Sequence, residues 1–145
     1  MKITLIITTY NWPESLSLVI KSIRRQTVHP DEIIVADDGS KGETKDLITY
    51  INDNFEMNII HSWQSDNGFR AARSRNKAIF KASGDYIVLI DGDVILHPNF
   101  IKDHIDNAEQ GFFIQGSRAL LSEDETKKVI KTNEINFSVF SSKMK

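Results

Sequence analysis

Short apolar runs alternate with segments of helical periodicity along this 145-residue chain, and that alternation is the strongest constraint on its fold. The runs at 3–8, 33–36 and 86–90 are rich in Ile, Val and Leu, as is typical of strands buried on both faces. Each is followed by a stretch whose apolar residues recur every three or four positions. Such alternation predicts an α/β domain, with a mainly parallel sheet and helices on both faces.

Weaker signals extend this pattern. A third strand is predicted over 57–61 and a fifth over 112–115, and a short polar helix over 123–132. Helices are predicted over 70–82, with Ala71, Ala78, Ile79 and Ala82 inward, and over 99–107 after Pro98.

Two helix starts carry the spacing of a capping box, in which a side chain at the helix start bonds the backbone three residues on. Asn11 and Glu14 have this spacing before the first helix, and Ser40 and Glu43 have it before the second. No internal repeat or linker divides the chain, so a single domain is predicted.

Composition excludes several classes of function. The 18 basic and 20 acidic residues give a net charge of −2, which argues against a nucleic-acid-binding domain. The absence of Cys excludes disulfides, zinc–thiolate sites, iron–sulfur clusters and thiol nucleophiles. Without a long apolar run or a signal-peptide cleavage site, the expectation is a soluble cytoplasmic protein.

Polar residues follow three of the predicted strands where each strand ends. Ligands of parallel α/β sheets bind at the carboxyl ends of the strands, so these residues are expected to meet along one rim. The residues concerned are Thr8, Tyr10 and Asn11 after the first strand, Asp37 and Asp38 after the second, and Asp91 and Asp93 after the fourth.

The Asp91-Gly92-Asp93 sequence is the sharpest of these features. Gly92 allows an unusual bend that would turn both carboxylates toward one ligand. Two carboxylates suit Mg²⁺ or Mn²⁺ together with the phosphates of a substrate, which predicts a diphosphate ligand. The alternative is an ordinary polar turn after a strand.

Other rim residues carry two interpretations each. Asp38 could accept a hydrogen bond from a base N–H or a ribose hydroxyl, or the Asp pair could simply form a turn that caps the next helix through Ser40. Tyr10 could stack on a nucleobase or pack over the sheet end. Arg70 lies at a helix start, where it could meet a diphosphate.

The remaining charged and titratable groups favour plainer interpretations. The cations Arg73, Lys77 and Lys81 are interpreted as a solvated basic face. The four histidines at 29, 61, 97 and 104 show no metal-ligand spacing and are interpreted as surface or loop residues. The chain has no G-x-G-x-x-G, P-loop or G-x-S-x-G motif, which leaves a nucleotide held by carboxylates and a metal.

Several segments in order resemble the donor-binding half of family-two glycosyltransferases with the Rossmann-like GT-A fold. The resemblance covers residues 1–118, predicted to form the nucleotide-sugar-binding core. It rests on the segments Ile6–Asn11, Ser22–Ile23, Gln26–Thr27, Glu32–Ser40, Asn67–Ala72, Arg75–Asn76, Gly84–Ile87 and Asp91–Asp93. The version with Phe69-Arg70 looks most like bacterial transferases that build surface polysaccharides or lipopolysaccharide cores.

The resemblance implies roles for these residues. Thr8, Tyr10 and Asp38 would hold the uracil of a UDP-sugar, Asp91 would touch the ribose or sugar, and Asp93 would bind Mn²⁺ or Mg²⁺ on the diphosphate. Donor-binding roles are also expected of Asn11 and Arg70, and Asp91 is expected to assist at the metal. The family inverts the anomeric centre as an acceptor hydroxyl displaces the nucleotide.

The family also implies features that these residues do not supply. The general base is expected beyond residue 145, with 119–145 a partial continuation, so the chain would be truncated and inactive alone. The Glu123–Glu125 run is interpreted as a solvated helix start. A saccharide or lipid-linked acceptor, peripheral association with the inner face of a membrane and a homodimer are further expectations.

Two alternatives remain open at this point. A sugar-nucleotidyltransferase would share the fold, but it needs a Gly-rich loop with a basic residue after the first strand, which residues 8–13 lack. A non-catalytic nucleotide-binding module, similar to a response regulator, would place its acidic pair after the first strand. Here that pair follows the second.

Overall fold

The computed structural model describes residues 1–135 and contains one parallel sheet with strand order β3-β2-β1-β4. Every pairing in this part of the chain is parallel, which confirms the predicted α/β architecture. The strands are β1 (Ile3–Thr9), β2 (Glu32–Asp37), β3 (Ile59–Trp63) and β4 (Tyr86–Asp91). The helices are α1 (Pro13–Ile23), α2 (Gly42–Phe55), α3 (Ala71–Lys81), α4 (Phe100–Asn107) and α5 (Glu123–Thr132).

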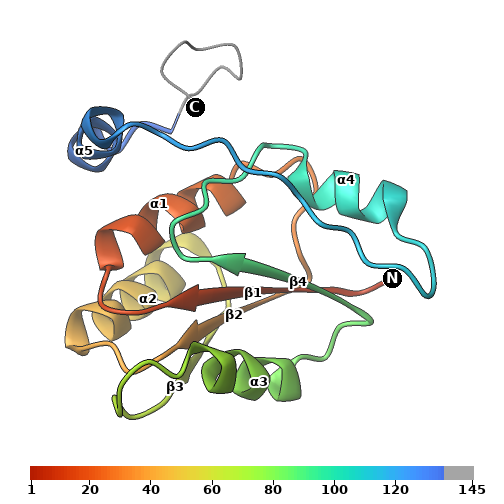
Figure 1. Cartoon of the computed structure of the whole chain (residues 1–145), viewed down its shortest axis with the longest axis horizontal. Coiled ribbons are helices and arrows are strands. Elements are labelled where there is room, and N and C mark those ends of the chain that lie inside the picture. Colours follow the sequence, from red (N-terminus) through yellow and green to blue (C-terminus); the bar gives the residue numbers. More distant parts are fainter. Residues whose placement is uncertain (136–145) are drawn as a thin grey trace.

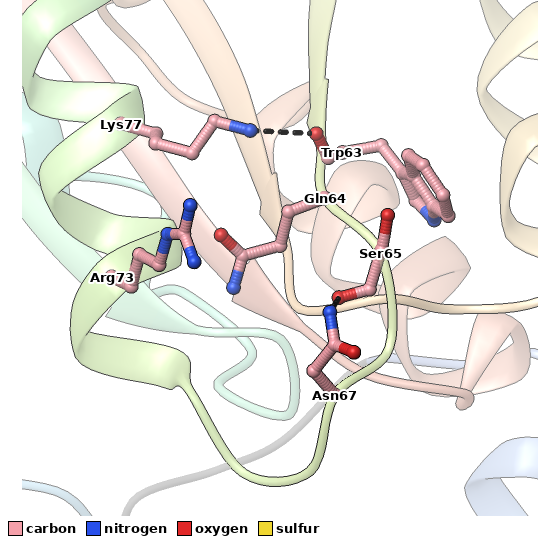
Figure 2. Close-up of a pocket in the computed structure, with 6 residues that line it drawn as sticks. All are labelled: Trp63, Gln64, Ser65, Asn67, Arg73 and Lys77. Atoms are coloured by element: carbon pink, nitrogen blue, oxygen red, sulfur yellow. Dashed lines mark hydrogen bonds between the residues drawn. The ribbon is translucent and has the colours of Figure 1, made fainter.

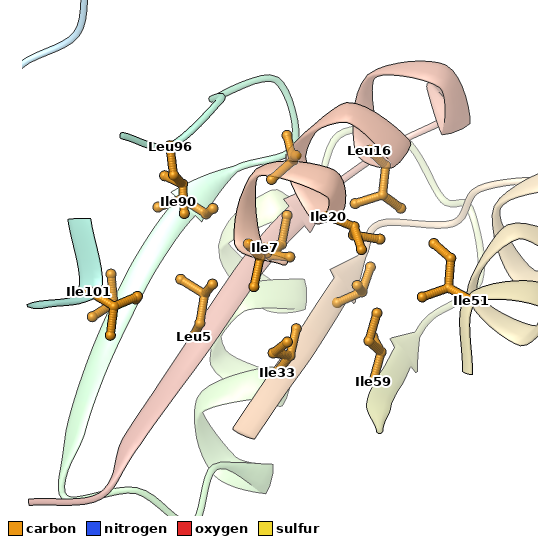
Figure 3. Packing of buried hydrophobic residues seen from close by; sticks show 14 of the residues in the cluster. Leu5, Ile7, Leu16, Ile20, Ile33, Ile51, Ile59, Ile90, Leu96 and Ile101 are labelled. Atoms are coloured by element: carbon orange, nitrogen blue, oxygen red, sulfur yellow. The ribbon is translucent and has the colours of Figure 1, made fainter. Parts of the chain in front are cut away.

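The central strand β1 is covered on both sides, which explains its unbroken apolar sequence (Figure 1). Side chains alternate between the two faces of a strand. Leu5 and Ile7 therefore point into the large cluster beneath α1, α2 and α4, whereas Ile6 points toward α3 and contacts the cluster around Ala78. Figure 3 shows how tightly the larger cluster packs between helices and sheet.

The periodicity after the first apolar run predicts a helix, and in α1 the residues with that spacing, Leu16, Val19, Ile20 and Ile23, are all buried. The prediction for α3 is wrong at Ile79, which is 38% exposed. On this helix the buried positions are Ala71, Ser74 and Ala78. The helix thus turns a small-residue face to the sheet and leaves its larger apolar side chains outside.

The predicted strand over 112–115 does not form, and its residues are exposed. The apolar run is three residues long, between Gly111, which has a φ of +85°, and Gly116. A turn closed by the Phe112 N–H and the Glu109 carbonyl precedes it. The segment passes beside β4 as irregular chain, and a groove of about 860 Å³ separates the two.

The last described helix, α5, was predicted with the right bounds. Ser122 caps it by accepting a hydrogen bond from the Glu125 N–H. It packs back on α1 through a small cluster of Leu18, Val129 and Ile135, so residues 119–135 are attached to the core. The rest of the predicted continuation, residues 136–145, lies outside the described part of the chain.

The short helix α4 is held to β4 by a buried histidine. His104 packs 4.7 Å from the Phe100 ring, and its Nδ1 lies 3.1 Å from the Tyr86 hydroxyl. Burial lowers the pKa of His104, and the nearby Asp103 carboxylate opposes that change only in part. The interpretation of this histidine as a surface residue is therefore wrong.

We expect the free energy of unfolding to fall as the pH drops below about 6.5. Burial makes His104 harder to protonate in the folded chain than in the unfolded chain, so the unfolded state binds more protons in this range. Chemical denaturation at a series of pH values measures the slope. His104→Phe should flatten it, whereas the exposed His29, changed to Gln, should leave it unaltered; equal slopes for all three proteins would contradict the assignment.

Candidate functional site

The carboxyl ends of β1, β2 and β4 form one rim, as the sequence predicts. The sheet register pairs Thr8 with Asp91 and Thr9 with Asp37. Hydrogen bonding to β1 continues one step past the strands, because Asp38 N–H donates to the Thr9 carbonyl at 3.1 Å and Gly92 N–H donates to the Thr8 carbonyl at 2.7 Å. Both acidic segments are thus fixed to the same strand.

Asp37 builds the turn after β2. Its Oδ1 accepts hydrogen bonds from the backbone N–H groups of Gly39 and Ser40, and its Oδ2 lies 2.8 Å from His61 Nε2. Burial raises the pKa of this fully buried carboxyl, but the hydrogen bonds from His61 and Ser40 outweigh it and hold the pKa below its ordinary value. His61 therefore has a structural role that its sequence position did not suggest.

Asp38 has a different task from its neighbour. Its Oδ1 accepts a hydrogen bond from Gln64 Nε2 at 2.6 Å, and its Oδ2 accepts one from the Arg70 N–H at 2.7 Å. The carboxylate is 4% exposed and orders the loop that leads from β3 into α3. Gln64, which sequence reasoning missed, keeps its own Oε1 buried and without a partner among the described residues.

Neither predicted capping box forms. The helix starts at Trp12 and Lys41 have no side-chain cap. Instead Asn11, which adopts a left-handed φ of +47°, donates its N–H to Ser40 Oγ at 2.8 Å and accepts from the Lys41 N–H at 2.9 Å. These bonds join the loop after β1 to the loop after β2. The side chains of Asn11 and Ser40 are therefore occupied between the loops and do not cap their own helices.

Tyr10 connects the loop after β1 to the loop after β3. Its hydroxyl donates to Asp66 Oδ2 at 3.0 Å, and the side chain is 51% exposed. The hydrogen bond and negative charge of Asp66 raise the pKa of this phenol. The Arg70 side chain is exposed at the start of α3, so both residues remain accessible to a ligand.

Arg75 connects two parts of the rim and is the second residue that sequence reasoning missed. Its Nε donates to Thr8 Oγ1 at 3.0 Å, and its Nη2 lies 2.8 Å from Asp91 Oδ1. The spacing holds a signal for this role: Arg75 follows Ala71 by four positions and precedes Ala78 by three. An arginine so placed lies on the sheet-facing side of α3.

Gly92 brings the acidic pair against β1. A Cβ at this position would lie 2.7 Å from the Thr8 carbonyl oxygen, which no other residue type tolerates. Asp93 is exposed beyond it and has no hydrogen-bond or ion-pair partner among residues 1–135. In this described part no group of three acidic or His side chains could enclose a metal, so a cation here would need oxygen ligands from elsewhere.

A small cavity of about 240 Å³ lies beside the rim, between α3 and the loop after β3 (Figure 2). Arg73 and Lys77 border it from α3, and Gln64 and Asn67 border it from the loop. Lys77 Nζ donates to the Trp63 carbonyl at 3.1 Å. The Trp63 indole points away from the two cations in Figure 2 and donates its Nε1–H to the Ser40 carbonyl.

Comparison with known proteins identifies the family. A family model described as "Glycosyl transferase family 2" matches residues 4–144. The chain belongs to this family. The resemblance inferred from the rim motifs is therefore confirmed.

The curated relatives are bacterial glycosyltransferases. The hyaluronan synthase of Pasteurella multocida is 32% identical over 104 residues, which are 71% of this chain and 10% of that protein. The O-antigen chain rhamnosyltransferase RfbN of Salmonella typhimurium is 39% identical over 101 residues, or 66% and 29% of the two chains. The chain thus spans less than a third of the length of these two relatives.

Solved structures confirm the GT-A fold. Staphylococcus aureus TarS superposes with a TM-score of 0.62 at 22% identity, over 73% of this chain and 19% of that one. The glucosyl-3-phosphoglycerate synthase of Mycobacterium tuberculosis, solved with Mn²⁺ and UDP, gives a TM-score of 0.56 at 22% identity, over 74% and 40%. No helix in the described residues has the length and apolar character needed to cross a bilayer.

The turn after β2 yields a test with a matched control. Gly39 has a φ of +103°, and a Cβ there would lie 2.6 Å from the Asp66 Cα. We expect Gly39→Ala to destabilise the chain by about 1–3 kcal/mol, because the loop carrying Asp66 must move. Gly42→Ala should change stability little, since nothing lies within 4 Å of the added Cβ. Urea unfolding compares the two; equal midpoints would contradict the strained turn.

Proposed function

We propose that this rim binds the nucleotide of a UDP-sugar through a divalent cation, as the donor site of an inverting glycosyltransferase. The observation that carries the proposal is the attachment of both acidic segments to one strand, β1, through the backbone N–H groups of Asp38 and Gly92. Family membership makes sugar transfer the chemistry to expect. The acceptor would be a saccharide or a lipid-linked molecule used in the synthesis of surface polysaccharide. The transfer would take place in the cytoplasm.

The nucleoside would bind on the β2 side of the rim. Asp38 uses one lone pair on each oxygen within the protein, and a carboxylate has about four acceptor positions. It therefore keeps acceptor positions for a uracil N–H. Tyr10 would offer its exposed ring to the base, Thr8 and Asn11 would border it, and Arg70 would approach the diphosphate from the start of α3.

The diphosphate would bind on the β4 side. Asp93 is exposed and has no partner within residues 1–135, so it can hold Mn²⁺ or Mg²⁺ with phosphate and water oxygens completing the shell. When bound, the ion would stabilise charge on the departing diphosphate. The mycobacterial relative in structure, solved with Mn²⁺ and UDP, supports this pairing.

Asp91 would meet the ribose or sugar while Arg75 keeps it in place. Its Oδ1 is already paired with the Arg75 guanidinium. Because the same guanidinium also bonds Thr8 Oγ1, it sets the spacing between the two sides of the donor site. Arg75 is thus proposed as a positioning residue for Asp91 and Thr8.

The first test is UDP binding with Mn²⁺ and with EDTA, measured by calorimetry. We expect the wild-type chain to bind UDP more tightly with Mn²⁺, and Asp93→Ala to lose that difference because the exposed carboxylate would hold the ion. The control is Asp53→Ala, which removes an exposed carboxylate on α2 and should behave as wild type. Unchanged metal dependence in Asp93→Ala would sink the metal assignment.

The second test concerns Arg75. Arg75→Met should weaken UDP binding in the presence of Mn²⁺ by roughly tenfold, equivalent to about 1.4 kcal/mol, because Asp91 and Thr8 lose their shared partner. Arg75→Lys keeps the charge but cannot bond both residues, so it should restore only part of the affinity. Arg73→Met removes an exposed cation of the same helix and is the matched control. Thermal unfolding of each variant separates positioning from a loss of fold.

A further inference from the structure

Positive charge is concentrated on α3. Residues 70–81 contain five of the 18 basic residues and no Asp or Glu, although the chain as a whole is acidic. Arg75 faces the sheet and is neutralised by Asp91. Arg73, Lys77 and Lys81 have no acidic partner among residues 1–135, so their charge is available to a ligand.

Two phenylalanines accompany these cations. Phe80 is 93% exposed and Phe69 is 95% exposed, the latter just before the start of α3. The buried positions Ala71, Ser74 and Ala78 define the inner side of the helix. At 100° per residue, Arg73 and Phe80 project from the opposite side, with Lys77 about 40° from Arg73. Lys81, the last residue of the helix, lies closer to the inner side but is exposed. We name these five residues, Phe69, Arg73, Lys77, Phe80 and Lys81, the α3 face.

The α3 face includes a recess for an anionic group. Arg73 has no hydrogen-bond partner among the described residues, and Lys77 donates one bond, to the Trp63 carbonyl. Both border the cavity of about 240 Å³, with Asn67 on its far side (Figure 2). Their unused N–H groups are suited to phosphate oxygens.

Cations together with exposed aromatic side chains fit an anionic lipid surface better than a soluble anion. Basic residues attract the phosphates of such a surface, and Phe side chains enter the boundary between headgroups and acyl chains. A soluble phosphate would use the cations and leave Phe69 and Phe80 in water.

We propose that the α3 face is a peripheral membrane-binding surface that recognises anionic phospholipid headgroups. Arg73 and Lys77 receive a headgroup phosphate at the recess, Lys81 adds charge, and Phe69 and Phe80 insert at the boundary. This assignment replaces the interpretation of the three cations as a merely solvated face. It does not rest on the proposed donor site, although it brings the edge of the rim near Arg70 to the lipid surface.

Vesicle co-sedimentation tests the proposal. The chain should bind phosphatidylcholine vesicles that contain phosphatidylglycerol and should not bind vesicles of phosphatidylcholine alone. Binding should weaken with added salt. The triple variant Arg73→Gln, Lys77→Gln, Lys81→Gln should lose about a hundredfold in affinity, since each basic residue near an anionic surface contributes roughly fivefold. Phe80→Ser should weaken binding even though it keeps every charge.

Matched variants on α2 and α5 decide between this surface and general electrostatics. A control triple variant, Lys41→Gln, Lys45→Gln, Lys128→Gln, removes the same amount of positive charge from elsewhere on the surface. A second control, Tyr50→Ser, removes an aromatic residue of α2 that is 56% exposed. Both should bind vesicles as wild type does. Equal losses in the two triple variants, no effect of Phe80→Ser, or equal binding to neutral vesicles would each overturn the proposal. UDP affinity and unfolding midpoints, measured in parallel, should stay unchanged in all variants.

Discussion

The parallel hydrogen bonding of β1 to both of its neighbours is the constraint on which the rest of this structure depends. It does not stop where the strands stop, because the carbonyls of Thr8 and Thr9 accept one further bond each, from Gly92 and Asp38. The two acidic segments are therefore extensions of the sheet rather than loops attached to it. The buried apolar residues of β1 that hold the domain together also set where the polar site lies.

Much of this arrangement could be predicted from the sequence because it follows from local periodicity. Continuous apolar runs fix a parallel sheet, and its topology then gathers the residues that follow each strand. What could not be predicted is which contacts each of two adjacent side chains makes. Asp37 and Asp38 look equivalent in sequence, yet one is buried within a turn with His61 and the other organises a loop through Gln64.

The failed capping predictions have one physical cause, which is competition from partners distant in sequence. Asn11 and Ser40 have local capping spacing, but each bonds to the other's loop, where two chain segments gain order at once. The sequence predicts no role for Arg75, and the direction of this side chain on α3, toward the sheet, is what lets it bond Thr8 and Asp91 while Arg73 stays exposed. The apolar run at 112–114 suggested a strand, but the glycines around it leave it too short to pair.

The contact of Gly92 with β1 has a mechanical consequence. The peptide at Gly92 lies against the Thr8 carbonyl with no space for a side chain, and the Val94 N–H donates to the Asp91 carbonyl, so the backbone of Asp93 is fixed from both sides. The stretch that follows is fixed as well, because Val94 and Leu96 pack in the main core and the Leu96 N–H donates to Ser22 Oγ. The side of the site that carries Asp93 is thereby tied to the sheet and to α1 at once, so a change at Gly92 or at Leu96 would move the carboxylate.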